Sequence, residues 1–310
     1  MQKSKADDIK RQADLINMHS ENFLWQISQL VQASRLFKNK NIRAGAAASL
    51  KGYLVDYHSA NAASGVGEIN VELPIDRKIP FNSRAARVYA SHVGLLISAI
   101  NFCRKEFGKA VVGDLGDLLN GLSELFGEAV EVYKTAQTSF ERTGKGGLGI
   151  KFIRLVDNNK NACPSLHVEI VGYIHCRLNA IINAHAPNPR IYQPIKDVYF
   201  QKSVRILEAV LLVKQHVVMD IALGLALLSS HKDYMTKEQA DNMVNAMFQH
   251  DYFSMDTATI LEVRAKILSI YDDAAARIQN EKNIPANIAL ISYLRDFAEE
   301  STARQPKFML

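Results

Sequence analysis

Apolar residues in this chain recur at spacings of three and four, and this helical period limits most what the chain can fold into. Near the N-terminus the pattern runs through Leu15, Ile16, Phe23, Leu24, Ile27, Leu30 and Val31. Such spacing places the apolar side chains on one face of a helix. The alternation of period two that is typical of half-buried strands is nearly absent. The sequence therefore predicts an all-α fold.

Breaks rich in Gly and Pro divide this pattern into separate helices. One or two helices are expected over residues 5–37, and others over 43–58, 83–107, 111–137, 164–185, 202–230, 237–249, 257–279 and 285–300. Residues 59–68 and 139–149 are expected to be loops, and residues 69–81, with two prolines, an extended stretch with one short strand. Thr236 and Gln239 have the spacing of a capping box.

With 310 residues, of which 48 % are hydrophobic and 22 % charged, the chain can bury a large core. No linker is long or polar enough to require a boundary, so residues 1–310 are expected to form a single domain. No stretch reaches the roughly 18 uncharged apolar residues of a spanning helix. Residues 88–103 and 221–230 come nearest, but both are short and bounded by charge. Residues 206–230 would nearly qualify without Glu208, Lys214, His216 and Asp220. We expect residues 206–230 to be a helix buried in a soluble bundle, with a membrane-embedded helix as the alternative.

Charge and cysteine content narrow the cellular setting. The N-terminus, MQKSKADDIKRQADL, lacks the apolar segment of a signal peptide, and three cysteines do not suggest a disulfide framework. We therefore expect a cytoplasmic protein, either soluble or peripheral to a membrane. The net charge of +5 is too small for a nucleic-acid-binding surface, so no nucleic-acid partner is expected. It suits anionic ligands or an anionic membrane face.

Two stretches carry groups that core packing does not require, and both have a chemical use. In VLLVKQHVVMDIALG, His216 and Asp220 lie four residues apart, so on a helix the carboxylate can hold one ring nitrogen and leave the other reactive. In NACPSLHVEI, Pro164 suits the first position of a helix. The N–H groups of that turn and the Ser165 hydroxyl form an anion site, over which His167 can donate a proton.

The two stretches together resemble a known superfamily. PSLH followed by KQHVVMD is similar to the second and third motifs of the type 2 phosphatidic acid phosphatases, a group that includes bacterial acid phosphatases and vanadium haloperoxidases. The Leu of PSLHV, the KQH triplet and the segments LPIDRKIPF and VDNNKNACPSLHV resemble the branch of inositol-phosphorylceramide synthase-like lipid phosphotransferases. The resemblance covers about residues 73–228. It implies a helical catalytic core at 73–230, with helical extensions at 1–60 and 235–310.

The resemblance also implies roles for individual residues. His216 would attack phosphorus, Asp220 would orient it, and His167 would act as general acid toward the leaving group. Ser165 and the neighbouring backbone would hold the phosphate oxygens. The implied chemistry uses no metal ion and no other cofactor.

Two motifs of the superfamily are incomplete in this chain. The first motif is a Lys separated by six residues from an Arg-Pro pair. Here Arg142 matches the Arg but is followed by Thr143, and Lys134 lies one residue too far upstream. In the third motif Val210 stands where an Arg is commonest, and Lys214 is expected to supply the positive charge.

The sequence therefore predicts a phosphatase or phosphotransferase that acts on a phosphate ester, such as a lipid phosphate or phosphodiester, through a phosphohistidine. It predicts that His167 and His216 meet across a cavity lined by basic side chains. Two alternatives remain open: a vanadium-dependent haloperoxidase, and a non-catalytic helical interaction protein with a degenerate site.

Overall fold

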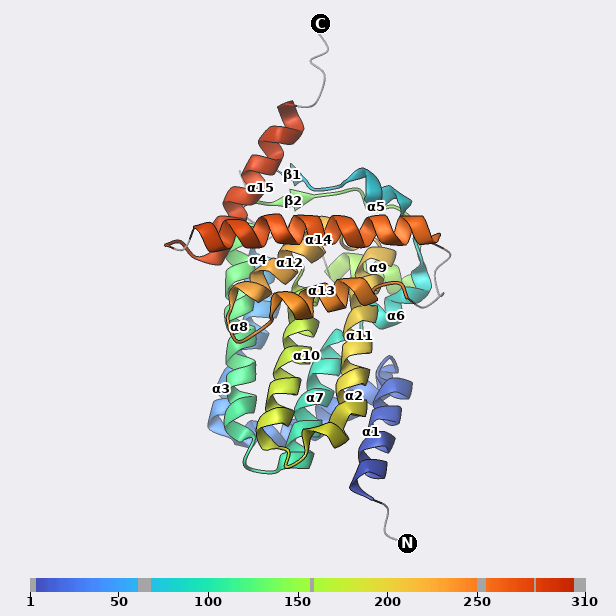
Figure 1. Cartoon of the computed structure of the whole chain (residues 1–310), viewed down its shortest axis with the longest axis vertical. Helices are drawn as coiled ribbons and strands as arrows, with labels where there is room; N and C mark the ends of the chain where they lie inside the picture. Colours follow the sequence, from blue (N-terminus) through green and yellow to red (C-terminus); the bar gives the residue numbers. More distant parts are fainter. Residues whose placement is uncertain (1–3, 61–67, 157–158, 250–254, 282, 304–310) are drawn as a thin grey trace, which may run out of the picture.

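The computed structural model describes residues 4–60, 68–156, 159–249, 255–281 and 283–303, and helices make up most of it (Figure 1). The predicted all-α fold class is confirmed. The first helices are α1 (Lys5–His19), α2 (Phe23–Ala33), α3 (Lys40–Lys51), α4 (Tyr57–Ala60), α5 (Pro74–Lys78), α6 (Ala86–Tyr89), α7 (His92–Phe107) and α8 (Val112–Thr135). They are followed by α9 (Leu148–Val156), α10 (Leu166–His185), α11 (Gln193–Leu212), α12 (Val218–Ser230), α13 (Lys237–Ala246), α14 (Thr257–Asn280) and α15 (Ala286–Ala303).

Short elements connect the helices. Single turns occur at η1 (Ser34–Lys38), η2 (Gly52–Asp56), η3 (Ser83–Ala85), η4 (Asn159–Asn161) and η5 (Pro189–Tyr192). The strands β1 (Ile69–Asn70) and β2 (Thr138–Ser139) pair in parallel over two residues each. Residues 61–67 of the predicted loop lie outside the described residues.

Polar side chains mark where several helices begin. Asn22, Asn39 and Asp256 accept backbone N–H groups at the starts of α2, α3 and α14. Ser4 and Thr236 form capping boxes at α1 and α13, and the second of these is the box predicted from the sequence. These residues satisfy N–H groups that have no partner inside the helix.

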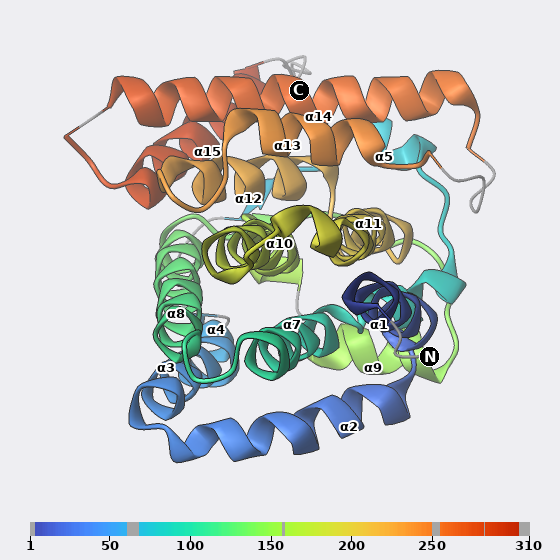
Figure 2. The same cartoon turned by 60° about the horizontal axis from the view of Figure 1, so that its bottom comes forward.

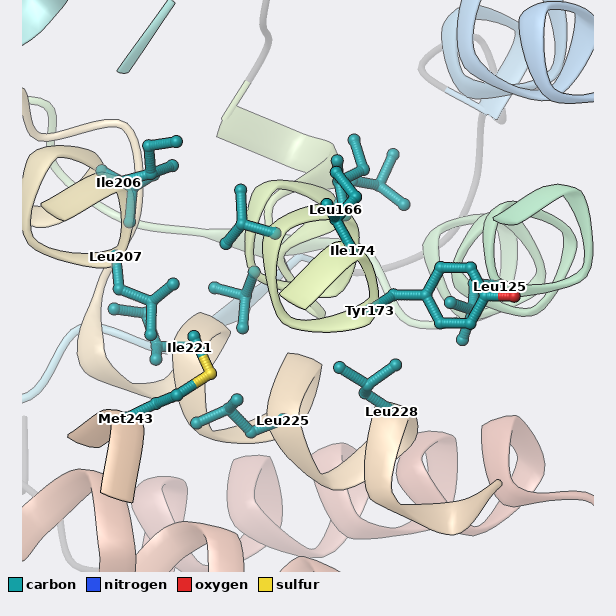
Figure 3. Close-up of a cluster of buried hydrophobic side chains, with 14 of the residues drawn as sticks. Leu125, Leu166, Tyr173, Ile174, Ile206, Leu207, Ile221, Leu225, Leu228 and Met243 are labelled. Carbon is teal, nitrogen blue, oxygen red and sulfur yellow. The ribbon is translucent and has the colours of Figure 1, made fainter. Parts of the chain in front are cut away.

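Helix α10 lies at the centre of the molecule and is buried along most of its length. Figure 3 shows apolar side chains from α10, α11 and α12 packed together, among them Leu166, Ile174, Ile206, Ile221 and Leu225. Buried apolar side chains from α1 through α15 belong to one continuous cluster. The stretches predicted as terminal extensions therefore pack against the same core as residues 73–230.

Helices pack on two opposite sides of α10. Figure 2 shows α2 and α3 along one side and α14 along the other, with α7, α10 and α11 between them. Within the described part of the chain, no helix combines the length and the apolar character needed to cross a bilayer.

The helix predicted over residues 202–230 is two helices. Helix α11 begins earlier than predicted, at Gln193 with Pro194 in its first turn, and ends at Leu212. The chain then turns through residues 213–217 before α12 begins at Val218. Contacts with α5, which is distant in sequence, hold this turn, so the helical period of the sequence could not reveal it.

Two helices form where the sequence predicts none. Residues 74–78 are helical because Pro74 suits the first turn and Asp76 accepts the N–H of Leu73 at 2.8 Å. Helix α9 begins at Leu148, inside a predicted loop, and buries Ile150 and Ile153. That spacing of three is a helical signal, which the preceding glycines obscure.

Candidate active site

The turn between α11 and α12 places His216 inside the protein. Lys214 has a positive φ of 55°, a conformation that L-residues seldom adopt. The N–H groups of Gln215 and His216 both donate to the carbonyl oxygen of Val210, at 3.1 and 3.2 Å. This compact turn directs the imidazole of His216 into the core, where it is 4 % exposed.

Asp220, in the first turn of α12, holds His216 from one side. Its Oδ2 lies 3.0 Å from Nδ1 of His216 and accepts the N–H of Val217 at 3.1 Å. A carboxylate at Nδ1 favours the tautomer that leaves the lone pair on Nε2. The predicted contact is therefore present, although His216 lies in the turn before α12 and not on the helix itself.

His167 and Ser165, at the start of α10, face Nε2 of His216. This nitrogen lies 3.3 Å from Nδ1 of His167 and 3.3 Å from Oγ of Ser165. The two imidazole rings are 5.3 Å apart between centroids and inclined at 66°. Two histidines that are 49 residues apart in the chain therefore lie side by side.

The start of α10 differs from the prediction. Pro164 precedes the helix, which begins at Leu166 with Ser165 as its N-cap. The hydroxyl of Tyr133 donates to the carbonyl oxygen of Pro164. The N–H of Ser165 donates to the backbone carbonyl oxygen of Asp220 at 3.0 Å. Because the Ser165 N–H joins α10 to α12, the predicted anion site is reduced to the Ser165 hydroxyl and the following N–H groups of the first turn.

Two further rings pack against His167. His92, the first residue of α7, and Tyr89 each lie 4.4 Å from His167 between ring centroids. Nδ1 of His92 is 3.0 Å from the carbonyl oxygen of Tyr89. Burial lowers the pKa of His167 well below its ordinary value, and the neighbouring His92 and His216 lower it further. His167 is therefore neutral at neutral pH in this arrangement.

Asp76 of α5 holds the turn from the other side. Its Oδ1 accepts the N–H of Val218 at 2.9 Å, and its carbonyl oxygen accepts a hydrogen bond from Nζ of Lys214 at 2.7 Å. Burial raises the pKa of Asp76 to about 6, although backbone hydrogen bonds from Leu73 and Val218 oppose this. Burial also lowers the pKa of Lys214, against the attraction of Asp76 and Glu72.

A pocket of about 430 Å³ opens beside His216. Its lining includes Lys214 and Arg77, the carboxylates of Glu72, Asp76 and Glu141, and the rings of Phe81 and Phe140. Nε of Arg77 pairs with Glu72 at 2.9 Å. The expectation of a cavity lined by basic side chains is therefore wrong in part, because carboxylates share the lining with two cations.

Arg142 and Lys134 are not among the residues that line this pocket. Arg142 follows β2, and its guanidinium lies 5.8 Å from the ring centroid of Phe140. Lys134 is exposed in the last turn of α8 and pairs with Glu131 at 3.3 Å. The structure thus brings His167, Asp220 and Ser165 into contact with His216. Of the predicted site residues only His216 and Lys214 line the pocket, and His167, Asp220, Ser165, Arg142 and Lys134 do not.

Sequence reasoning missed Asp76, Arg77 and His92. The first two belong to LPIDRKIPF, and adjacent acidic and basic residues between two prolines were the available signal. His92 lies 75 residues before His167 in sequence (167 − 92), and no local pattern indicates its position.

Among the residues that the structure describes, no group of three or more His, Cys, Asp or Glu side chains is arranged to hold a metal ion. Comparisons with models of known protein families, with curated proteins and with solved structures find no match for this chain.

Proposed function

We propose that this protein is a phosphatase or phosphotransferase that acts on a phosphate ester through a phosphohistidine at His216. The observation that carries the proposal is the arrangement of this imidazole. Asp220 holds its Nδ1 at 3.0 Å, and its Nε2 faces His167 and Ser165 beside a pocket. An oriented nucleophile next to a proton donor is what phosphoryl transfer through an enzyme-bound intermediate requires.

In the first step, Nε2 of His216 attacks phosphorus, and the bond from phosphorus to the ester oxygen breaks. His167 gives its proton to the departing oxygen. In the second step, water or an acceptor hydroxyl attacks phosphorus and gives its proton to His167, while the P–N bond breaks. Lys214, Arg77 and the Ser165 hydroxyl supply the positive charge and the hydrogen bond for the phosphate oxygens.

This chemistry requires two changes when a phosphate binds. The nitrogen atoms of His167 and His216 are 3.3 Å apart, so the rings must separate to admit phosphorus between them. His167 must also gain a proton. The negative charge of a bound phosphate favours the imidazolium and opposes the burial that lowers the pKa of His167.

Cys163 is a further nucleophilic side chain near the site, in addition to the hydroxyl of Ser165. Burial raises the pKa of its thiol well above the ordinary value, and the carboxylates of Asp220 and Glu169 raise it further. The thiol is therefore protonated at neutral pH and is a poor nucleophile. This supports His216 as the attacking group.

The proposal predicts that His216→Ala lowers kcat for p-nitrophenyl phosphate by about a thousandfold or more, because the nucleophile is lost. His167→Ala should lower it by about a hundredfold or more, because the general acid is lost. Acid-labile, alkali-stable phosphate should label the wild-type protein and not His216→Ala. Orthovanadate, which mimics the transition state, should inhibit the wild type competitively.

His185→Gln is the matched control. His185 is the last residue of α10, at the opposite end from His167, and pairs with Asp114 at 2.8 Å. Its replacement should leave turnover unchanged. Wild-type turnover in both His216→Ala and His167→Ala would exclude the mechanism and favour the non-catalytic alternative.

A further inference from the structure

Helix α2 exposes apolar side chains along its outer face. The exposed residues are Phe23, Leu24, Ile27, Leu30 and Val31, and Leu24 is 74 % exposed. The helix contains no charged residue, and its inner side packs on the core through Trp25 and Ala33. A contiguous exposed apolar surface of this kind marks a binding surface more often than an ordinary protein exterior.

Helix α9 also exposes apolar side chains to solvent. Ile150 and Ile153 are buried beneath it, whereas Leu148, Phe152 and Leu155 are 85 %, 67 % and 82 % exposed. A short helix that buries one apolar face and exposes another needs a second apolar medium for the exposed face.

The two helices lie on the same side of the molecule. In Figures 1 and 2, α2 and α9 are both on the side that faces away from α14. An apolar groove of about 480 Å³ adjoins α2, and the exposed side chains of Leu30, Leu50 and Val93 help to line it. The groove continues the apolar surface of α2 toward α3 and α7.

The charged residues within the two segments around these helices are basic, although Asp56, just beyond the first segment, pairs with Lys51 at 2.9 Å. Residues 23–55 contain five basic and no acidic residues, namely Arg35, Lys38, Lys40, Arg43 and Lys51, and all five are exposed. Residues 144–156 contain Lys145, Lys151 and Arg154 and likewise no acidic residue. A second copy of this chain packed on the same face would bring like charges together, whereas anionic lipid headgroups would complement them.

We propose that α2 and α9 dock this protein on the surface of a bilayer that contains anionic lipids. The exposed apolar side chains enter the boundary between headgroups and acyl chains, and the basic residues contact the headgroups. This surface is distinct from the histidine site, and its binding does not require catalysis.

Docking also orients the pocket beside His216, a consequence that rests on the proposed function. Arg154 of α9 donates to the carbonyl oxygens of Thr143 and Gly144, at 2.7 and 3.0 Å, and lies over the ring of Phe81. Thr143 and Phe81 line the pocket. Helix α9 is therefore joined to the pocket wall, and contact of α9 with a bilayer brings the pocket to the headgroup layer, where a lipid phosphate would lie.

Vesicle binding tests the docking surface without reference to activity. The full chain is mixed with vesicles of phosphatidylcholine, alone or with phosphatidylserine, and its partition is measured by co-sedimentation. Partition should be about tenfold stronger with phosphatidylserine and should weaken as salt rises. Trp25, the only tryptophan in the sequence, lies on α2, so phosphatidylcholine with brominated acyl chains should quench its fluorescence.

Two variants and one control locate the surface. Leu24→Glu with Val31→Glu on α2, and Phe152→Glu with Leu155→Glu on α9, should each lower partition by about tenfold or more. Leu261→Glu is the matched control, because Leu261 is 58 % exposed on α14, on the opposite side. Circular dichroism establishes that all variants are folded.

Several results would overturn the proposal. The first is that the wild type does not bind vesicles that contain phosphatidylserine. The second is that Leu261→Glu weakens vesicle binding as much as the α2 and α9 variants do. The third is that light scattering shows a wild-type dimer that the α2 variant converts to a monomer. His216→Ala should bind vesicles like the wild type. Loss of activity in that variant with intact vesicle binding separates the two proposals, and so does vesicle binding by a wild type that lacks phosphatase activity.

Discussion

His216 is held at both ring nitrogens, by Asp220 at Nδ1 and by His167 and Ser165 at Nε2. All four side chains are buried. Burying polar groups is costly unless they are hydrogen-bonded to one another, so each contact restricts the positions of the others. The result is an imidazole whose Nδ1 is held by Asp220 before any ligand binds.

His167 should remain neutral in solutions where an ordinary histidine is half protonated, at about pH 6.5. Its pKa is lowered by burial and then by His92 and His216. Nitrogen-15 chemical shifts of the imidazole should therefore report the neutral form down to lower pH. In His92→Phe the midpoint of the His167 titration should rise, because the repulsion between the His92 and His167 imidazoles is removed.

Because the folded-state pKa of His167 is lowered, the unfolded chain takes up this proton first as pH falls, so His167 destabilises the fold below about pH 6.5. Orthovanadate should raise the midpoint, since a bound oxyanion favours the imidazolium. A wild-type midpoint at the ordinary value would contradict the close packing of the rings.

At the scale of elements, the short helix α5 determines where α11 ends and α12 begins. Asp76 supplies an acceptor to Val218 at the start of α12, and its carbonyl oxygen receives Lys214 from the turn. The helical period of residues 202–230 is continuous, yet the chain breaks there because these contacts stabilise the turn. This interruption between α11 and α12 also places His216 opposite His167.

Asp76→Asn should destabilise the protein by about 1–3 kcal/mol, and the loss should be smaller above pH 6 than below it, because burial raises the pKa of Asp76 to about 6 and so penalises the ionised carboxylate. The carboxylate accepts the N–H groups of both Leu73 and Val218, and an amide keeps only one acceptor oxygen. Urea unfolding would give the free energy of unfolding, and hydrogen exchange should become faster at residues 214–218.

Asp56→Asn makes the same chemical change in a half-exposed residue that pairs with Lys51. It should alter the free energy of unfolding by less than about 1 kcal/mol. Equal effects of the two substitutions would show that α5 does not hold the turn.

For the whole molecule, the important feature is that one cluster of buried apolar side chains runs from Ile9 in α1 to Leu294 in α15. Helix α1 contacts α11, which leads into the turn that carries His216. The stretches predicted as extensions therefore contribute to the stability of the part that holds the site.

Ile9→Ala should lower the free energy of unfolding of the whole chain by about 2–5 kcal/mol, because it leaves a cavity at a fully buried position. Within each protein, circular dichroism and Trp25 fluorescence should report the same urea midpoint as each other, as expected for one cooperative unit, and the midpoint of Ile9→Ala should be lower than that of the wild type. Leu15→Ala, at an exposed position of the same helix, is the control and should have a much smaller effect. A separate, earlier Trp25 transition would mean that the N-terminal helices unfold independently.

The sequence by itself determined the helical class, most helix ranges and the contact between His216 and Asp220. These depend on spacings of three and four residues, which act within one or two helical turns. A carboxylate four residues after an imidazole can reach it in a regular helix. Here Asp220 in α12 also reaches His216, although His216 lies in the turn before the helix.

Only the tertiary structure decided what surrounds that pair. The break before α12 depends on Asp76, and the ring packed on His167 comes from His92, both remote in sequence. The fold also decided that Arg77, and not Arg142 or Lys134, joins Lys214 in the lining of the pocket. Such contacts come from helices that meet through packing of the whole core, and no periodicity along the chain encodes which distant helices will meet.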